Sequence, residues 1–392
     1  MFMVFQTTNE WPILLSLAGV ILGAATILPS TVSIVLGSIA FVVGLGAFLR
    51  DVQELRRRWS DYEFSVIAVP FPAASIPPPS AYPDPVYLHV PGRGTALVSD
   101  AIDRAVASGG IAAQLDDEPY QLPRALKASA RYVLPVRNRG RLVFNGQIIG
   151  MHGDPLPPGT SPAPPVRLHI ARFFDSQCSN EMCTLRITHR ETAEEFDPRH
   201  ALLTDAAGHL KTLAESTLAD CVGISTIAVT SDGALVTVRQ TSRNIASALL
   251  LAPSGSGSLD PRDLTDGSSG VLQDIIRHGM ERELCEETGI RPEEIRRTRV
   301  TGFARWLERG AKPEFLGLTE LSATASDLAE RRPATSDERL YTGGIFLVNM
   351  DIAALGRELA DGKDLLYAPS MPERLKEDGS LPLLLALRAA AL

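Results

Sequence analysis

This chain of 392 residues has no excess of positive charge, since 38 Lys and Arg stand against 46 Asp and Glu for a net charge of -8. Proteins that bind duplex DNA or RNA neutralise many phosphates with a basic surface, so this balance argues against a nucleic-acid duplex as partner. Binding of a small anionic ligand is not excluded, because it needs only a local site and a divalent metal. The length suggests two or three folding units.

Cysteine is scarce, with four residues in the chain. Only Cys178 and Cys183 lie close together, and this C-x4-C pair with His189 nearby falls short of a zinc motif. We expect reduced thiols and no zinc site. The histidines of this region are also expected to be ordinary surface or core residues, because they lack ligand spacing: His152, His169, His189, His200 and His209.

Charge is absent from Trp11 to Leu49, a run that Pro29 interrupts near its middle. The two halves, Trp11–Leu28 and Val32–Leu49, have 18 residues each. At about 1.5 Å per residue each would form a helix roughly 27 Å long, enough for the core of a bilayer. Backbone polar groups must pair internally in lipid. The sequence therefore predicts a two-helix transmembrane hairpin over 11–49, with the lipid bilayer as a partner.

A signal peptide and a buried soluble hairpin are the alternatives. A signal peptide would need a basic leading segment, but Met1–Glu10 contains no Lys or Arg, and it would leave the second apolar run unexplained. Arg50 and the run Arg56–Arg58 follow the second span directly. By the positive-inside rule we expect a multi-pass protein of the cell membrane, with both termini in the cytoplasm.

Small residues recur at four-residue spacing in these spans, as in the pairs Gly19 and Gly23, and Ala40 and Gly44. Such faces let helix backbones approach closely. They serve either to join the two helices of one hairpin or to assemble a homo-oligomer through the transmembrane helices.

Residues 50–85 are predicted to form a juxtamembrane segment and a linker, because Pro70–Pro85 contains seven prolines. Residues 86–217 form a mixed α+β middle region to which the sequence assigns no chemistry. Its patterns predict helices at Ser99–Ser108 and Ala206–Leu218, and strands at Arg141–Met151 and Val166–Phe174.

The strongest motif is RELCEETGI, from Arg282 to Ile290. Its glutamates Glu283, Glu286 and Glu287 are spaced i, i+3, i+4, so a helix places all three on one side. Gly289 then supplies the left-handed residue that ends the helix. Clustered carboxylates suit Mg²⁺ or Mn²⁺ bound to substrate phosphates. An acidic surface helix without a metal is the alternative.

Strand patterns surround this motif, and Asp232-Gly233 indicates a hairpin between two of them. Together with a C-terminal helix, they and the motif make residues 218–392 resemble the Nudix hydrolase superfamily. The resemblance implies the α/β class, as a Nudix α/β/α sandwich. The expected strands are Val222–Thr230, Ala234–Gln240, Ala246–Ala252, Arg299–Trp306, Glu314–Leu321 and Thr342–Val348.

The resemblance also implies roles for single residues. Glu283, Glu286 and Glu287 would be catalytic and hold Mg²⁺ (or Mn²⁺), and Glu314 is a speculative base. In the family's pattern a Gly, five residues, a Glu and seven residues precede the Arg. Counting back from Arg282 gives Asp274 and Ser268 at the places of that Glu and Gly. Asp274 would then pair with Arg282, which in the family braces the loop–helix–loop, and the resemblance places both Arg282 and Asp274 in the catalytic set.

The Gly-rich stretch Pro253–Asp260 resembles the segment that usually precedes this motif, displaced by an insertion through Pro261–Ser269. Gly255 and Gly257 would therefore contact the substrate. Such enzymes hydrolyse a nucleoside diphosphate linked to another group, so the expected ligand is a nucleotide-type small molecule.

An anchor joined to such a domain is also similar to the transmembrane-Nudix effectors of bacterial cyclic-oligonucleotide antiphage systems. Two hypotheses follow. One is a membrane-anchored, Mg-dependent Nudix hydrolase, and the other is a receptor that binds a (cyclic) nucleotide signal and assembles membrane-disrupting helices.

Overall fold

The computed structural model describes the chain in ranges: residues 17, 19, 20, 23, 31–60, 62–66, 76–123, 126–127, 133–134, 145–157, 164–196, 198–241, 247–264, 269–329, 331 and 342–392. Two compact units divide it. The first comprises 1–67, 123–145 and 185–198, and the second comprises 68–122, 146–184 and 199–392.

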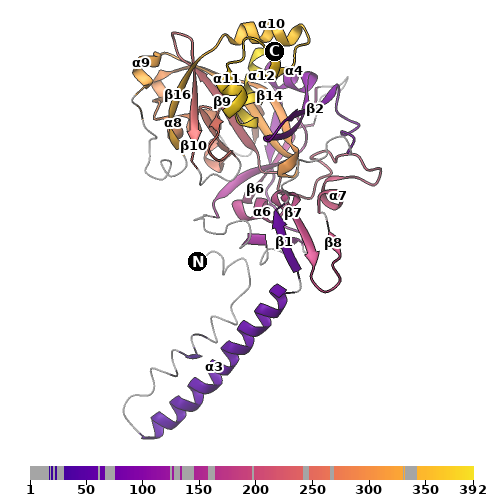
Figure 1. Cartoon of the computed structure of the whole chain (residues 1–392), viewed down its shortest axis with the longest axis vertical. Helices are drawn as coiled ribbons and strands as arrows, with labels where there is room; N and C mark the ends of the chain where they lie inside the picture. The colour runs from indigo at the N-terminus through magenta and orange to yellow at the C-terminus, as the bar shows by residue number, and fades with distance from the viewer. Residues whose placement is uncertain are drawn as a thin grey trace. The chain divides into compact units, whose positions relative to one another are not determined.

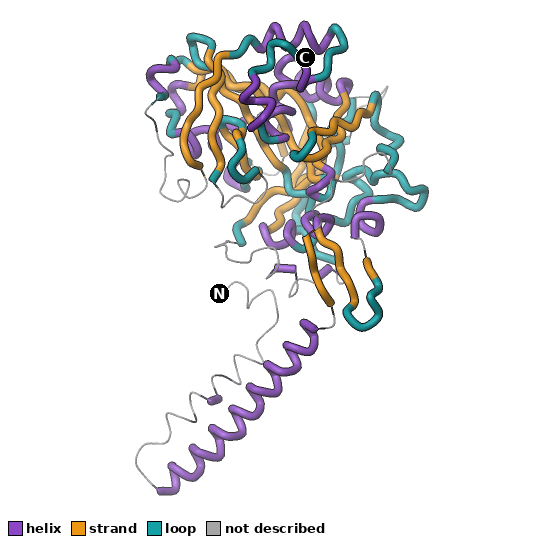
Figure 2. Tube along the Cα trace, in the orientation of Figure 1, coloured by secondary structure: helices purple, strands orange, loops and turns teal. Residues whose placement is uncertain are grey.

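The first unit contains a long helix, α3 (Thr31–Ser60), and a small antiparallel sheet of order β1-β7-β8. Helix α3 is the long purple helix of Figure 2 and covers the whole second apolar run of the sequence. Several of its apolar side chains are more than half exposed, among them Ile39, Val42 and Val43. The strands are β1 (Tyr62–Val66), β7 (Leu185–His189) and β8 (Glu195–Phe196).

The expected membrane hairpin finds no direct support here. Within the described ranges no helix combines the length and apolar character that crossing a bilayer requires. Most of the first run, Trp11–Leu28, lies outside the described residues, although Leu17, Gly19, Val20 and Gly23 are helical. A Cβ atom added to Gly44 of α3 would lie 3.2 Å from the Val20 backbone nitrogen, so the two segments pack closely there.

The second unit is built on a mixed sheet with the order β11-β10-β9-β15-β14-β3-β2, to which β12 adds beside β9 and β16 beside β10. Figure 1 shows these strands side by side with helices against them. The strands are β2 (Pro85–Val90), β3 (Gly94–Ser99), β9 (Gly223–Val229), β10 (Ala234–Gln240), β11 (Leu251–Ala252), β12 (Gly255–Ser258), β14 (Ile295–Trp306), β15 (Lys312–Leu321) and β16 (Thr342–Asn349).

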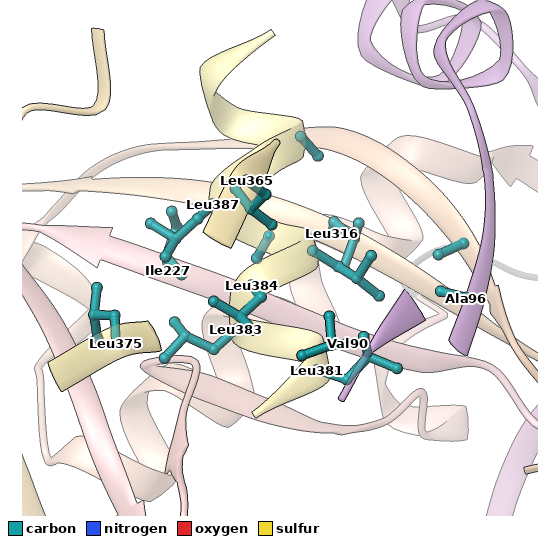
Figure 3. Packing of buried hydrophobic residues seen from close by; sticks show 14 of the residues in the cluster. Val90, Ala96, Ile227, Leu316, Leu365, Leu375, Leu381, Leu383, Leu384 and Leu387 are labelled. Carbon is teal, nitrogen blue, oxygen red and sulfur yellow. The ribbon is translucent and has the colours of Figure 1, made fainter. Parts of the chain in front are cut away.

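Alternation along the central strands gives this sheet two apolar faces. Ile227 and Leu235 belong to a core with the C-terminal helix α12 (Leu381–Ala391), as Figure 3 shows for Ile227 beside Leu384 and Leu387. The next residues, Ala228 and Val236, pack instead with Leu284 of helix α8 (Leu272–Thr288). The unit is therefore an α/β/α sandwich, and α8 and α12 lie on opposite faces.

A second sheet of order β13-β4-β6-β5 completes this unit, with β4 and β6 parallel. Its junction with β9 buries polar groups: Asn180 Nδ2 donates to Asp220 Oδ1 at 2.8 Å, and His169 Nε2 lies 3.0 Å from the Ala219 carbonyl oxygen. The His152 and His169 rings lie 4.2 Å apart. The strands are β4 (Ala112–Leu115), β5 (Gln147–His152), β6 (Val166–Arg172) and β13 (Ser269–Val271).

Short helices connect these sheets. The Ser99 side chain caps α4 by accepting from the Ile102 N–H at 3.3 Å. The helices are α4 (Asp100–Ser108), α6 (Phe173–Gln177), α7 (Pro198–Leu203), α9 (Ala325–Leu328), α10 (Ile352–Ala360) and α11 (Glu373–Asp378), with 3-10 helices η2 (Asn180–Thr184), η3 (Pro261–Asp263), η4 (Pro292–Glu294), η5 (Leu307–Arg309) and η7 (Leu365–Tyr367).

One expected helix is wrong. Residues 206–218 form turns rather than a helix. The Asp205 carboxylate accepts from the backbone N–H groups of Ala207 and His209, at 2.8 and 2.9 Å, and Gly208 adopts a φ of 86°. These local hydrogen bonds occupy backbone N–H groups that would otherwise bond within a helix. The domain boundaries at 86 and 218 stay predictions. Strands β2 and β3, from the expected middle region, pair with the sheet that contains β14.

Candidate functional site

The motif Arg282–Ile290 forms the last turns of α8 and its end. Gly289 adopts the left-handed conformation, with φ 70° and ψ 17°, and donates its N–H to the Cys285 carbonyl at 2.9 Å. This is the helix end that the sequence predicts. Leu284 is fully buried and fixes the rotation of the helix, so the glutamates on either side turn toward the neighbouring loops.

Arg282 is the organising residue of this site. Its Nε and Nη2 donate to the two carboxylate oxygens of Asp263 at 2.8 and 2.9 Å, and Nη2 also reaches the Ser258 carbonyl at 3.1 Å. Its Nη1 lies 2.7 Å from Glu283 Oε1 and 3.2 Å from Glu286 Oε2. Burial alone would lower the pKa of Arg282, but these acidic partners outweigh it and raise that pKa. The guanidinium stays charged and joins one loop to two glutamates.

The partner of Arg282 corrects the sequence prediction. Asp274, expected in that role, lies in the first turn of α8 with 58% of its side chain exposed, and it pairs with Arg277 at 3.5 Å. Ser268, the expected glycine position, lies outside the described residues. The Arg282 partner is Asp263, which is 3% exposed.

A sequence signal for Asp263 existed and was missed. Counting forward from Gly257, five residues separate the glycine from Asp263. This Gly-x5-acid spacing matches the first half of the Nudix pattern. The inserted residues therefore lie between Asp263 and α8, after Gly257 and its acidic partner. Asp263 is also held by its own turn, since the Asp260 N–H donates to its Oδ2 at 2.8 Å.

The two predicted substrate-contacting glycines lie on β12, which passes directly over α8. A Cβ atom at Gly255 would lie 2.4 Å from the Leu284 nitrogen, and one at Gly257 would lie 2.1 Å from Glu283 Oε1. Only glycine permits this approach of strand to helix. Gly255 therefore seats the helix, and Gly257 leaves the space that the Glu283 carboxylate fills.

The three box glutamates have different surroundings. Glu287 is buried, and its Oε2 accepts from the Ser256 N–H at 3.0 Å. The Glu283 side chain is 13% exposed and that of Glu286 is 30% exposed. The solvent exposure of the three carboxylates therefore increases from Glu287, which is buried beside β12, through Glu283 to Glu286.

These oxygen donors are of the kind that Mg²⁺ and Mn²⁺ prefer. Among the described residues, however, no group of three or more His, Cys, Asp or Glu side chains is arranged to hold a metal ion. Arg282 Nη1 lies between Glu283 and Glu286, and Ser256 holds Glu287. The donor set fits a divalent cation in its chemistry, whereas its carboxylates are turned toward protein partners.

Glu314, the speculative base, lies on β15 and is 4% exposed. Its Oε1 accepts from the Ser225 hydroxyl at 2.7 Å, and its Oε2 lies 3.2 Å from Lys312 Nζ. One oxygen is thus used in a buried ion pair within β15, and the other accepts a hydrogen bond from β9. We therefore assign Glu314 to the packing of the sheet.

Solved structures similar to this chain include Nudix proteins. One is a MutT protein of Methanosarcina mazei, at 15% identity over 41% of this chain and 89% of that one, with a TM-score of 0.23. Another is the Nudix hydrolase RenU of M. smegmatis, at 13% identity over 40% and 80%, with a TM-score of 0.22. A protein of Deinococcus radiodurans matches at 14% identity over 41% and 88%, with a TM-score of 0.24.

No family model matches this chain, and no curated protein is significantly similar to it.

The cysteines and histidines add no site of their own. All four cysteines are free thiols, and Cys178, Cys183 and Cys221 are buried. Burial raises the pKa of the Cys221 thiol well above its usual value. Burial is also the main cause that lowers the pKa of His169 to about 4, and His152 adds to it. The Cys221 thiol and the His169 imidazole are therefore neutral near pH 7 and belong to the core.

Proposed function

We propose that this protein is a divalent-metal-dependent Nudix-type hydrolase that acts on a nucleoside diphosphate linked to another group. The observation that carries this proposal is the clamp of Arg282 by Asp263. It joins the two halves of the motif, Gly257-x5-Asp263 and RELCEETGI, across an insertion that separates them in the sequence. An acidic surface helix would need neither the buried carboxylate of Asp263 nor the glycines that bring β12 onto α8.

Glu283, Glu286 and Glu287 would hold the metal, which would supply positive charge to neutralise substrate phosphates and to activate water. Asp263 fixes the guanidinium of Arg282, and Arg282 in turn positions Glu283 and Glu286. Buried Glu287 is anchored at its Oε2 by the Ser256 N–H. Because the Arg282 guanidinium contacts both Glu283 and Glu286, these two carboxylates would have to turn toward the cation when the metal binds.

The test is a screen of the full-length protein, in detergent or nanodiscs, against nucleoside diphosphate derivatives with and without Mg²⁺. Hydrolysis that requires the metal and is lost in Glu287→Gln supports the proposal. Metal-independent turnover, or turnover unchanged in Glu287→Gln, contradicts it.

We also propose that the chain is anchored in the cell membrane with both termini cytoplasmic. The support is the uncharged run Trp11–Leu49, the basic residues Arg50 and Arg56–Arg58 after it, and the exposed apolar side chains of α3. Resistance of the protein to carbonate extraction tests the anchor. A C-terminal reporter active only outside the cytoplasm would contradict the orientation.

A further inference from the structure

A cavity of about 770 Å³ lies beside the box, between α8 and the start of β14. Its volume is within the range of about 300–1,000 Å³ that small-molecule sites occupy. The box contributes Arg282 and Glu286 to its wall, and the preceding part of α8 contributes Arg277 and Glu281. The cavity thus borders the proposed catalytic helix, and neither Asp263 nor β12 lines it.

The charge of this cavity is opposite to that of the protein. Four arginines line it, Arg277, Arg282, Arg296 and Arg297, against two glutamates, whereas the whole chain carries a net charge of -8. Arginine guanidinium groups bind phosphate oxygens through paired, charge-assisted hydrogen bonds.

Two of these arginines have no acidic partner within the described part of the chain. Arg277 pairs with Asp274 and Glu281, and Arg282 pairs with Asp263. Arg296 and Arg297 are exposed and form no ion pair with any described residue. By contrast Arg299, two residues further along β14, lies 3.6 Å from Glu320. Unpaired guanidinium groups that converge on one cavity repel each other, and a bound anion removes that cost.

We propose that this cavity binds phosphate groups of the nucleotide ligand beyond those held at the box, with Arg277, Arg296 and Arg297 as the residues that select for them. The inference rests on the proposed function, because Arg282 and Glu286 belong to both sites. A ligand with only two phosphates would be satisfied at the box, whereas three further arginines suit a nucleotide that carries a longer polyphosphate chain.

Binding without turnover is measured first, on the full-length protein in EDTA with inorganic tripolyphosphate as the probe. Cys285 also lines the cavity, and the other three cysteines are buried, so its alkylation at pH 8.5 reports occupancy. Tripolyphosphate should slow this alkylation. The double variant Arg296→Ala/Arg297→Ala should weaken the binding by about tenfold or more, because two charge-assisted contacts are lost. Arg299→Ala, on the same strand, should leave it unchanged.

Equal tripolyphosphate affinity in the double variant and the unmutated protein would overturn the proposal. A matched experiment uses vesicles that contain phosphatidic acid. If the double variant loses binding to these vesicles but keeps its affinity for tripolyphosphate, the arginines serve a lipid headgroup and the proposal is wrong.

Kinetics separate this inference from the proposed function. With a substrate of four phosphates, the double variant should raise KM by about tenfold or more with kcat little changed, while KM for a two-phosphate substrate stays the same. Hydrolysis with unaltered KM for both substrates would refute the cavity's role and leave the enzyme assignment intact. Tripolyphosphate binding that depends on Arg296 and Arg297, with no hydrolysis of any substrate, would support the cavity and refute the enzyme.

Discussion

Arg282 and Asp263 lie nineteen positions apart in the sequence and form a two-pronged ion pair, with Nε–Oδ1 and Nη2–Oδ2 distances of 2.8 and 2.9 Å. The pair is almost completely buried, with side-chain exposures of 16% and 3%. It fixes the loop of η3 against α8 and aims the third nitrogen of Arg282 at Glu283 and Glu286.

Asp263→Asn should therefore damage both stability and activity. The change removes the two-pronged charged partner of a largely buried guanidinium and leaves it only Glu283 and Glu286, at a cost of about 2 kcal/mol. It also frees Glu283 and Glu286, so hydrolysis measured well below the unfolding temperature should fall by about a hundredfold. Asp274→Asn is the matched control on the exposed side of α8 and should leave both quantities unchanged. If Asp274→Asn lowers stability and activity more than Asp263→Asn does, the Asp274–Arg282 pairing suggested by the sequence would be correct instead.

The two glycines of β12 should respond differently to alanine. Gly255→Ala meets the backbone of α8 and should lower the free energy of unfolding by about 1–3 kcal/mol. Gly257→Ala meets the end of the Glu283 side chain, so it should reduce turnover with little loss of stability. Gly146→Ala has open space around it and serves as the control. Equal activity of Gly257→Ala and the unmutated protein would remove Glu283 from the active set.

The stability of the protein should depend on pH through His169. The pKa of this imidazole is about 4 in the folded chain and about 6.5 when unfolded, so the unfolded state binds more protons between these values. The contribution of neutral His169 is present above pH 6.5 and is lost as pH falls toward 4, by about 3 kcal/mol. Denaturant unfolding of the protein and of His169→Phe should therefore diverge across this window. Parallel curves for the two would contradict the assignment.

A leucine at Gly44 tests the role of the small residues in the apolar segments. Its side chain would separate α3 from the backbone at Gly19 and Val20, since a Cβ atom at Gly44 would already lie 3.3 and 3.2 Å from them. If these glycines only join two segments of one chain, Gly44→Leu should leave the protein in the membrane with unchanged hydrolysis. Gly19→Leu is the comparison, since no described atom lies within 4 Å of a Cβ added at Gly19. If the unmutated protein causes ligand-dependent dye leakage from liposomes and Gly44→Leu abolishes this leakage, the receptor hypothesis is favoured instead.

The periodic part of the fold could be predicted from the sequence. Strand β10 matches the expected bounds Ala234–Gln240, and the α8 end at Gly289 follows from glycine's freedom at positive φ. The start of β14 could not, because Ile295–Thr298 contains two adjacent arginines and lacks clean alternation. Pairing with Leu321, Glu320 and Thr319 of β15 holds this stretch in the sheet.

The site was harder to predict than the fold, because its key contact is made across an insertion. Counting back from Arg282 places the acidic partner within α8 itself, at Asp274. In the folded chain η3 packs against α8, and this contact makes Asp263 the partner of Arg282. Gly279 permits the contact. A Cβ atom at Gly279 would lie 2.9 Å from Asp263 Oδ2, so this close approach needs a glycine that the motif does not include.

The central claim is that the glutamates of α8 perform metal-dependent hydrolysis. The most direct measurement is the rate of phosphate-linkage cleavage by the full-length protein, with Mg²⁺ and after EDTA, beside Glu286→Gln and Glu287→Gln. The account predicts cleavage that disappears with EDTA and falls by several orders of magnitude in both variants, while thermal unfolding shows that they remain folded. Cleavage that survives EDTA, or that both variants retain, would contradict it.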